Sequence, residues 1–199
     1  MKTRKNLLVC ALFTSLLALA GCKDAAEKPA APAAQPAQAV SIPAIATEAK
    51  GFTVGSPMSV RTVYVFFDPQ CPHCSQLWAA ARPLKSQAKF VWIPVGLLNA
   101  ASAPQGAALL AAADPVAAMD AHEASMTAKT GGITASGSLD AQKAMVESNT
   151  KLMNRFQFSG VPTVIAKHAV TGDLVVKEGS MQTAVLAAVL GLQPPAPAN

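Results

Sequence analysis

The sequence predicts an α/β fold in which a central mixed β-sheet is flanked by helices and carries an inserted helical region. Between residues 51 and 193, runs of β-branched and aromatic residues alternate with helix-forming segments. A pair of cysteines stands where the strongest strand-like run gives way to a helix-forming segment. Apolar residues make up 51% of the 199 residues and charged residues 14%, which excludes a disordered chain as a whole.

The two central strands are expected at Arg61–Phe67 and Lys89–Val95, because both runs are rich in β-branched and aromatic residues. Asp68-Pro69-Gln70 ends the first run, and Ser75–Ala81 continues as good helix formers. Cys71 is therefore expected at the start of a helix. Pro72 then takes the first helical position, where its missing N–H costs nothing.

An inserted helical region is expected at about residues 98–158. Its helices are predicted at Ser102–Ala113, from Pro115 to about Lys129, and from Ser138 to about Phe156. Met145, Leu152 and Phe156 recur at helical spacing in the third helix, which predicts core contacts.

The last elements are a strand hairpin and a closing helix. The hairpin is predicted from Pro162–His168 and Asp173–Lys177, joined through Thr171-Gly172. The closing helix is expected at Ser180–Leu190, and residues 194–199 are expected to form a flexible tail.

The first 21 residues have the pattern of an export signal. A basic stretch precedes an apolar run from Leu7 to Ala20 that is too short to span a bilayer. Leu19-Ala20-Gly21-Cys22 resembles a bacterial lipobox, in which Cys22 is acylated and becomes the new N-terminus. We therefore expect a periplasmic protein anchored by lipid, with Lys23 favouring the outer membrane. The alternative is an ordinary signal peptide and a soluble periplasmic protein.

Residues 22–50 are expected to form a tether between the lipid and the folded domain at residues 51–193. Ala25–Val40 consists almost wholly of Ala, Pro, Gln, Glu and Lys, a composition that favours extended, solvated chain. Three of the positive charges behind the net charge of +5 lie in residues 1–21, which contain no acid, so the mature chain carries +2. With no basic stripe left to neutralise phosphates, nucleic acid is not an expected partner.

Only two of the four cysteines remain once the signal is removed and Cys22 is acylated. They form the sequence Cys71-Pro72-His73-Cys74, and a disulfide that closes so small a loop would stabilise the fold only weakly. We therefore interpret the pair as chemically reactive rather than structural. A thiolate at Cys71 would face unpaired N–H groups and the positive end of the helix dipole, and protonated His73 would add a nearby positive charge. Cys74, one turn further in, is expected to be shielded and to act as the resolving thiol.

The strand, the Cys-Pro-His-Cys helix start and Gly160-Val161-Pro162-Thr163 resemble the thioredoxin fold. The sequence from about Gly51 to Leu192 more closely resembles the catalytic domain of the DsbC/DsbG family of thiol:disulfide interchange proteins. The shared segments are Phe52-Thr53-Val54-Gly55, Tyr64-Val65-Phe66, Asp68-Pro69, Trp78 and Ala81-Arg82-Pro83.

This resemblance implies that Cys71 and Cys74 form a redox disulfide and that Pro162 is a cis-proline facing it. Val161, Pro162 and Thr163 are then expected to bind substrate, with the Val161 backbone pairing with an extended segment. The implied partners are exported proteins with cysteines and a membrane redox partner of the DsbD or DsbB type. No cofactor or metal is expected.

Three features depart from the family. The tether takes the place of the dimerisation module, so we expect a monomer. The Pro-His dipeptide and Val161 match the oxidase DsbA. Val65 stands six residues before Cys71, where thioredoxins place a buried carboxylate, so a proton relay must come from elsewhere or from water.

Two other classes of function stay open. Cys71, Cys74 and His73 could hold copper or zinc, although no second Cys/His pair is present to complete a tetrahedral site. The chain could also be a non-catalytic adaptor. His122 and His168 are expected to be solvated, and Phe66 and Trp78 to lie in the core.

Overall fold

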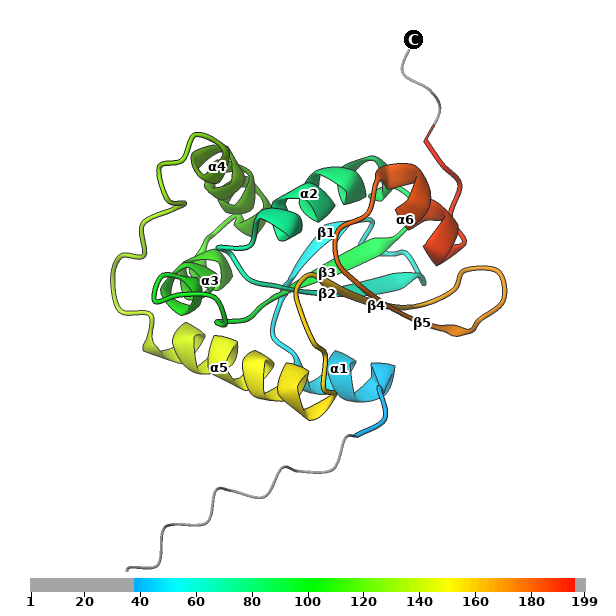
Figure 1. Ribbon diagram of the computed structural model, residues 1–199, viewed down its shortest axis with the longest axis horizontal. Coiled ribbons are helices and arrows are strands. Elements are labelled where there is room, and N and C mark those ends of the chain that lie inside the picture. Colours follow the sequence, from blue (N-terminus) through cyan, green and yellow to red (C-terminus); the bar gives the residue numbers. More distant parts are fainter. Residues whose placement is uncertain (1–37, 196–199) are drawn as a thin grey trace, which may run out of the picture. The chain divides into compact units, whose positions relative to one another are not determined.

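A five-stranded mixed β-sheet lies at the centre of the computed structural model, which describes residues 38–195. The strand order is β1-β3-β2-β4-β5 (Figure 1), with β2 and β3 parallel and the other neighbours antiparallel. The strands are β1 (Phe52–Gly55), β2 (Thr62–Phe67), β3 (Lys89–Pro94), β4 (Thr163–Lys167) and β5 (Leu174–Glu178). This architecture confirms the predicted α/β class.

Helices cover both faces of the sheet. Figure 1 shows α2 (Pro72–Ala81) and α6 (Thr183–Leu190) on one face, and α1 (Ile42–Glu48) and α5 (Asp140–Arg155) on the other. A short 3₁₀ turn at Arg82–Leu84 continues α2. The predicted helices after Cys71 and at the C-terminal end are therefore confirmed, with shifts of a few residues at their ends.

The two largest core clusters lie on opposite faces of the sheet, because neighbouring strand residues point to opposite faces. Phe67 and Trp92 pack with Trp78 under α2, with the Trp78 and Trp92 ring centroids 4.9 Å apart. Phe66 and Ile93 face α1 and α5. The prediction that Phe66 and Trp78 are core residues is confirmed, with 0% and 3% of their surfaces exposed.

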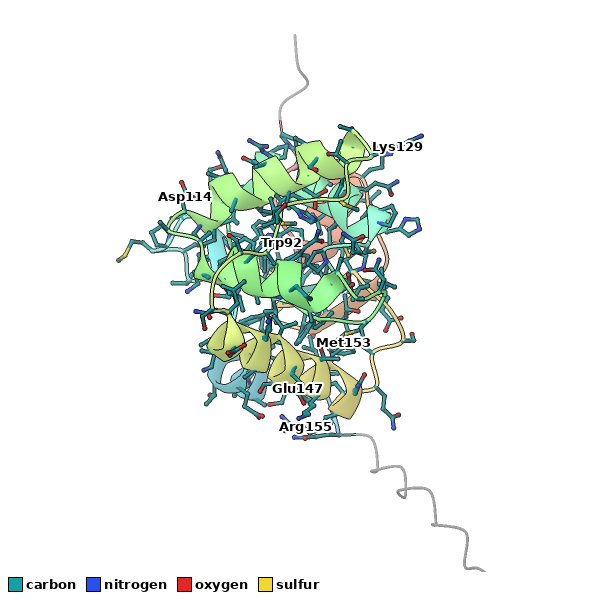
Figure 2. All side chains as sticks on the ribbon, turned by 90° about the vertical axis from the view of Figure 1, so that its left-hand side faces the viewer. Trp92, Asp114, Lys129, Glu147, Met153 and Arg155 are labelled. Atoms are coloured by element: carbon teal, nitrogen blue, oxygen red, sulfur yellow. The ribbon has the colours of Figure 1, made fainter. Side chains whose placement is uncertain are left out.

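The helical insertion between β3 and β4 consists of α3 (Ser102–Ala111), α4 (Pro115–Thr127) and α5. In Figure 2 these helices lie one below another across one end of the molecule, from α4, which starts beside Asp114, to α5, which ends at Arg155. Asp114 caps α4 by accepting the N–H groups of Val116 and Ala117. On α5, Leu152 is buried as predicted, but Met145 is 37% exposed and does not join the core.

The predicted boundary between tether and domain at residue 50 is wrong. Ser41 caps α1 by accepting the Ala44 N–H, and Ile45 on that helix is completely buried against α5 and the sheet. Arg155 on α5 also forms an ion pair with Glu48. Residues 41–48 therefore belong to the folded domain. The signal, the lipid site at Cys22, residues 22–37 and the end of the tail lie outside the described residues.

Candidate active site

Cys71 lies at the junction that the sequence predicted, between the end of β2 and the start of α2. The chain leaves β2 through a turn closed by the Cys71 N–H and the Asp68 carbonyl, 3.0 Å apart. Cys71 is then the N-cap of α2, and Pro72 and His73 occupy its exposed first turn. This placement brings the N–H groups of His73 and Cys74 near the Cys71 sulfur.

The two thiols differ in how easily they ionise, although both are buried free cysteines. The pKa of Cys71 is lowered from 9.0 to about 6, first by a hydrogen bond from the Cys74 thiol. The backbone N–H groups of Cys74 and His73 and the charge of His73 lower it further, and they outweigh the opposing effect of burial. Burial raises the pKa of Cys74, which therefore stays protonated.

The loop before β4 lies directly over Cys71. The peptide bond between Val161 and Pro162 is cis, as the resemblance implied. The Cys71 thiol is 3.5 Å from the Val161 carbonyl oxygen, which can accept its proton in a hydrogen bond. Thr163 is buried and fixes the loop by donating to the Gly160 carbonyl at 2.6 Å. The structure thus brings the three predicted substrate-binding residues together beside the predicted nucleophile.

A buried carboxylate that the sequence interpretation missed holds the loop in front of Cys71. Asp68 is completely buried and accepts hydrogen bonds from the N–H groups of Gln70, Leu97 and Leu98 at 2.7–3.0 Å. An acidic residue directly after an apolar strand and before Pro69 was the available signal, since such a side chain often bonds to the backbone of the next turn. Asp68 therefore joins the Cys71 turn to the loop after β3.

His122 corrects a prediction, because it is completely buried rather than solvated. Its Nε2 lies 2.7 Å from the Pro69 carbonyl oxygen, and its Nδ1 accepts the Ile133 N–H at 3.2 Å. Burial lowers the pKa of His122, against the opposing effects of the Pro69 hydrogen bond and of Asp68. His168, the other histidine expected to be solvated, is half-buried at the β4–β5 hairpin and accepts the Thr171 N–H.

A second carboxylate near the site comes from the insertion rather than from β2. Glu123 on α4 has one carboxylate oxygen that is buried without a hydrogen-bond partner. Burial raises the pKa of Glu123, a hydrogen bond with Ser75 of α2 opposes this, and the charge of Cys71 raises it further. Glu123 is therefore a candidate for the proton relay that Val65 cannot supply.

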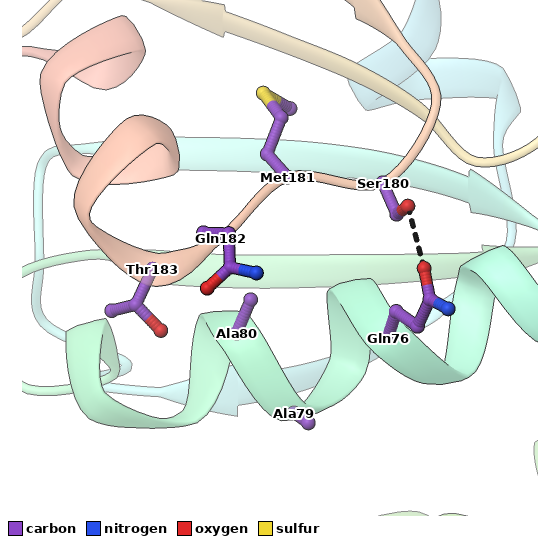
Figure 3. A pocket seen from close by; sticks show the side chains of 7 residues that line it. All are labelled: Gln76, Ala79, Ala80, Ser180, Met181, Gln182 and Thr183. Atoms are coloured by element: carbon purple, nitrogen blue, oxygen red, sulfur yellow. Dashed lines mark hydrogen bonds between the residues drawn. The ribbon is translucent and has the colours of Figure 1, made fainter.

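A hollow of about 610 Å³ opens beside the active-site helix. Figure 3 shows it between α2, which contributes Gln76, Ala79 and Ala80, and the segment entering α6, residues 180–183. The Ser180 hydroxyl donates to Gln76 Oε1 at 2.8 Å. The same Gln76 oxygen lies 3.4 Å from His73 Nδ1. The hollow therefore begins one helical turn from the cysteine pair and has a mixed polar and apolar lining.

The fold and the site define a thioredoxin-like protein with a Cys-Pro-His-Cys dithiol. Solved structures with this fold include the catalytic domain of Proteus mirabilis ScsC, which has a TM-score of 0.58 at 16% identity. That match covers 74% of this chain and 91% of the other. The thiol-disulfide exchange protein α-DsbA2 of Wolbachia pipientis has a TM-score of 0.55 at 18% identity, over 71% and 86% of the two chains.

In sequence, the chain is similar to the thiol:disulfide interchange protein DsbG. It is 33% identical to DsbG of Pseudomonas aeruginosa over 133 residues, which cover 66% of this chain and 51% of the relative. It is 32% identical to DsbG of Escherichia coli over 125 residues, 62% and 47% of the two chains. The chain thus spans about half the length of the curated relatives it matches. No protein-family model matches the sequence.

Among residues 38–195, no three His, Cys, Asp or Glu side chains gather closely enough to hold a metal ion. Over the same residues, none of the helices has the length and apolar character needed to span a bilayer.

Proposed function

We propose that the protein is a thiol:disulfide oxidoreductase of the cell envelope that uses the Cys71–Cys74 pair. The observation that carries the proposal is the difference in pKa between the two thiols. Cys71 has a pKa near 6, so it is largely thiolate at neutral pH, whereas the neighbouring Cys74 stays protonated. The similarity to DsbG supports the same activity.

In the reducing direction, the Cys71 thiolate attacks one sulfur of a substrate disulfide and expels the other sulfur as a thiolate. Cys74 then gives its proton to the expelled substrate thiolate, with Glu123 as the candidate relay, and attacks the Cys71 sulfur of this mixed disulfide. The second substrate thiolate leaves, and the Cys71–Cys74 disulfide remains. In the oxidising direction, a substrate thiolate attacks that disulfide at Cys71, and every step runs in reverse.

The substrates we propose are exported proteins that present cysteines in extended segments. Such a segment would pair with the backbone of Val161 next to Cys71, in the manner of a short added strand. A neighbouring substrate side chain would enter the hollow between α2 and residues 180–183. A membrane protein of the DsbD or DsbB type would then restore the pair to its starting state, and its identity sets the direction of exchange.

Trapping of mixed disulfides tests this proposal. In a Cys74→Ser variant of the full chain, the resolving step is removed, so substrates are expected to accumulate in covalent complexes that a reductant releases. Cys71→Ser and the double variant are the matched controls and should trap nothing. Equal trapping by Cys71→Ser would show that Cys71 is not the attacking thiol and would reject the mechanism.

A further inference from the structure

The loop between β2 and Cys71 is held from outside by the helical insertion. His122 reaches from α4 to the Pro69 carbonyl, 53 positions away in the sequence, at 2.7 Å. It is completely buried at this contact. A residue of the insertion thus binds the backbone two positions before the nucleophile.

The second ring nitrogen fixes the orientation of His122. Because the Ile133 N–H is a donor, Nδ1 must accept it, and the hydrogen is therefore on Nε2, where it is donated to Pro69. Gly132 lies against the same ring and has a φ of +91°; a Cβ at this position would lie 2.5 Å from Cε1 of His122. The neutral imidazole is therefore held between the backbone of residues 132–133 and the loop before Cys71.

A parallel link acts on the next residue of the loop. The Gln70 side chain donates to Gln105 of α3 at 2.5 Å and to the Gly131 carbonyl at 3.2 Å. Gln105 in turn donates to the carbonyls of Gly131 and Ile133 at 2.7 and 3.1 Å. The insertion therefore binds both Pro69 and Gln70, and the Cys71 N–H closes the same turn on Asp68.

We propose that His122 is a positioning residue for disulfide exchange, which holds the Pro69 carbonyl so that the Cys71 sulfur stays over the start of α2. This inference rests on the proposed function. The pKa of Cys71 is lowered by Cys74 and by the N–H groups of the first turn, and both effects require the sulfur to stay near the N-cap. If the turn before Cys71 is released, the sulfur can move away from these donors, and the thiolate becomes less stable.

Three substitutions separate the two hydrogen bonds of His122. His122→Gln places an amide donor near the position of Nε2 and keeps the bond to Pro69. His122→Asn places an acceptor near Nδ1, so it keeps the Ile133 bond and leaves Pro69 without its donor. His122→Phe keeps the ring and removes both bonds. His168→Phe, outside this network, is the control.

The readouts are the pH titration of the Cys71 thiolate in reduced full-length protein and the equilibrium constant for exchange with glutathione. His122→Asn and His122→Phe are expected to raise the titration midpoint by roughly one pH unit, which corresponds to about tenfold less thiolate below the midpoint. They should also shift the glutathione equilibrium toward the Cys71–Cys74 disulfide, because the reduced form loses stability. His122→Gln and His168→Phe should titrate like the wild type.

These variants distinguish positioning from general packing. If His122→Phe does not fold, His122→Asn still tests the Pro69 bond, and the near-ultraviolet circular dichroism of the tryptophans checks its fold. The inference is overturned if folded His122→Asn titrates like the wild type, or if His122→Gln and His122→Asn shift the midpoint equally. Either result leaves the proposed function intact, because that function is tested by the wild-type Cys71 thiolate and by the trapping variants, in all of which His122 is unchanged.

Discussion

At the scale of single residues, two thiols three positions apart behave differently although both are buried. Burial raises the pKa of Cys74, whereas at Cys71 the hydrogen bond from Cys74 and the nearby backbone N–H groups outweigh the effect of burial. Only Cys71 stands before the first turn of α2, where the N–H groups of His73 and Cys74 and the positive end of the helix dipole stabilise a negative charge. Cys74 is inside the helix and donates its proton toward Cys71. The pair therefore carries one negative charge at neutral pH.

Asp68 provides the first prediction at this scale. An asparagine at this position would present its NH₂ group to one of three backbone N–H donors that now face a carboxylate. Asp68→Asn is therefore expected to lower the free energy of unfolding by roughly 2 kcal/mol. Urea denaturation measures this loss. Asp173→Asn, at an exposed carboxylate, should stay within about 0.5 kcal/mol of the wild type, and an equally small loss at Asp68 would contradict the assigned role.

Residues also show where sequence reasoning is limited. The reactive pair could be predicted from the Cys-Pro-His-Cys motif after a strand, whereas the loop at Val161–Thr163 was predicted only from the family resemblance. His122 could not, since Asp120 and Glu123 stand close to it in the sequence of α4, and its burial comes from distant residues such as Pro69 and Ile133. The same holds for Glu123, whose position near Cys71 follows from the packing of α4 against α2. Such burial depends on tertiary contacts that a single sequence does not show.

At the scale of elements, the strands and helices with strong local sequence patterns were predicted, and those that depend on tertiary contacts were not. β2, β3 and α2 follow from long β-branched runs and a clear helix start. β1 has only four residues, and α1 has seven, directly after an alanine- and proline-rich tract. Helices this short are not stable alone, so α1 exists because Ile45 is buried against α5 and the sheet.

Ile45 therefore tests whether α1 belongs to the domain. Its side chain is completely buried, and Ile45→Ala is expected to lower the free energy of unfolding by about 2–4 kcal/mol. The measurement is again chemical denaturation of the folded domain. Val185→Ala on α6, where the valine is 51% exposed, is the control and should cost well under half as much. Equal losses for the two variants would place residues 41–48 in the tether, as the composition had indicated.

At the scale of the whole molecule, we propose a folded redox domain on a lipid-anchored tether. The N-terminal pattern that ends at Cys22 supports the anchor, and the domain itself begins before α1. Two acyl chains bind a protein stably to a bilayer, whereas one does so only marginally. The active site would then sample the envelope within the reach of the tether.

The anchor makes a prediction about fractionation. Cys22→Ser is expected to abolish incorporation of a labelled fatty acid and to move the protein from the membrane fraction to the soluble periplasmic fraction. Cys10→Ser, which changes a cysteine inside the signal, should leave both properties unchanged. Retention of label and membrane association by Cys22→Ser would contradict lipidation at this residue and favour an ordinary signal peptide.

The central claim is that Cys71 is a stabilised thiolate beside a protonated Cys74. The most direct measurement is the ultraviolet absorbance of thiolate in reduced wild-type protein as the pH is raised. A thiol with a lowered pKa ionises as the pH rises through that value, so one thiolate should appear with a midpoint near pH 6 and be absent from Cys71→Ser. A midpoint near 9.0, the ordinary value for a thiol, would contradict the account.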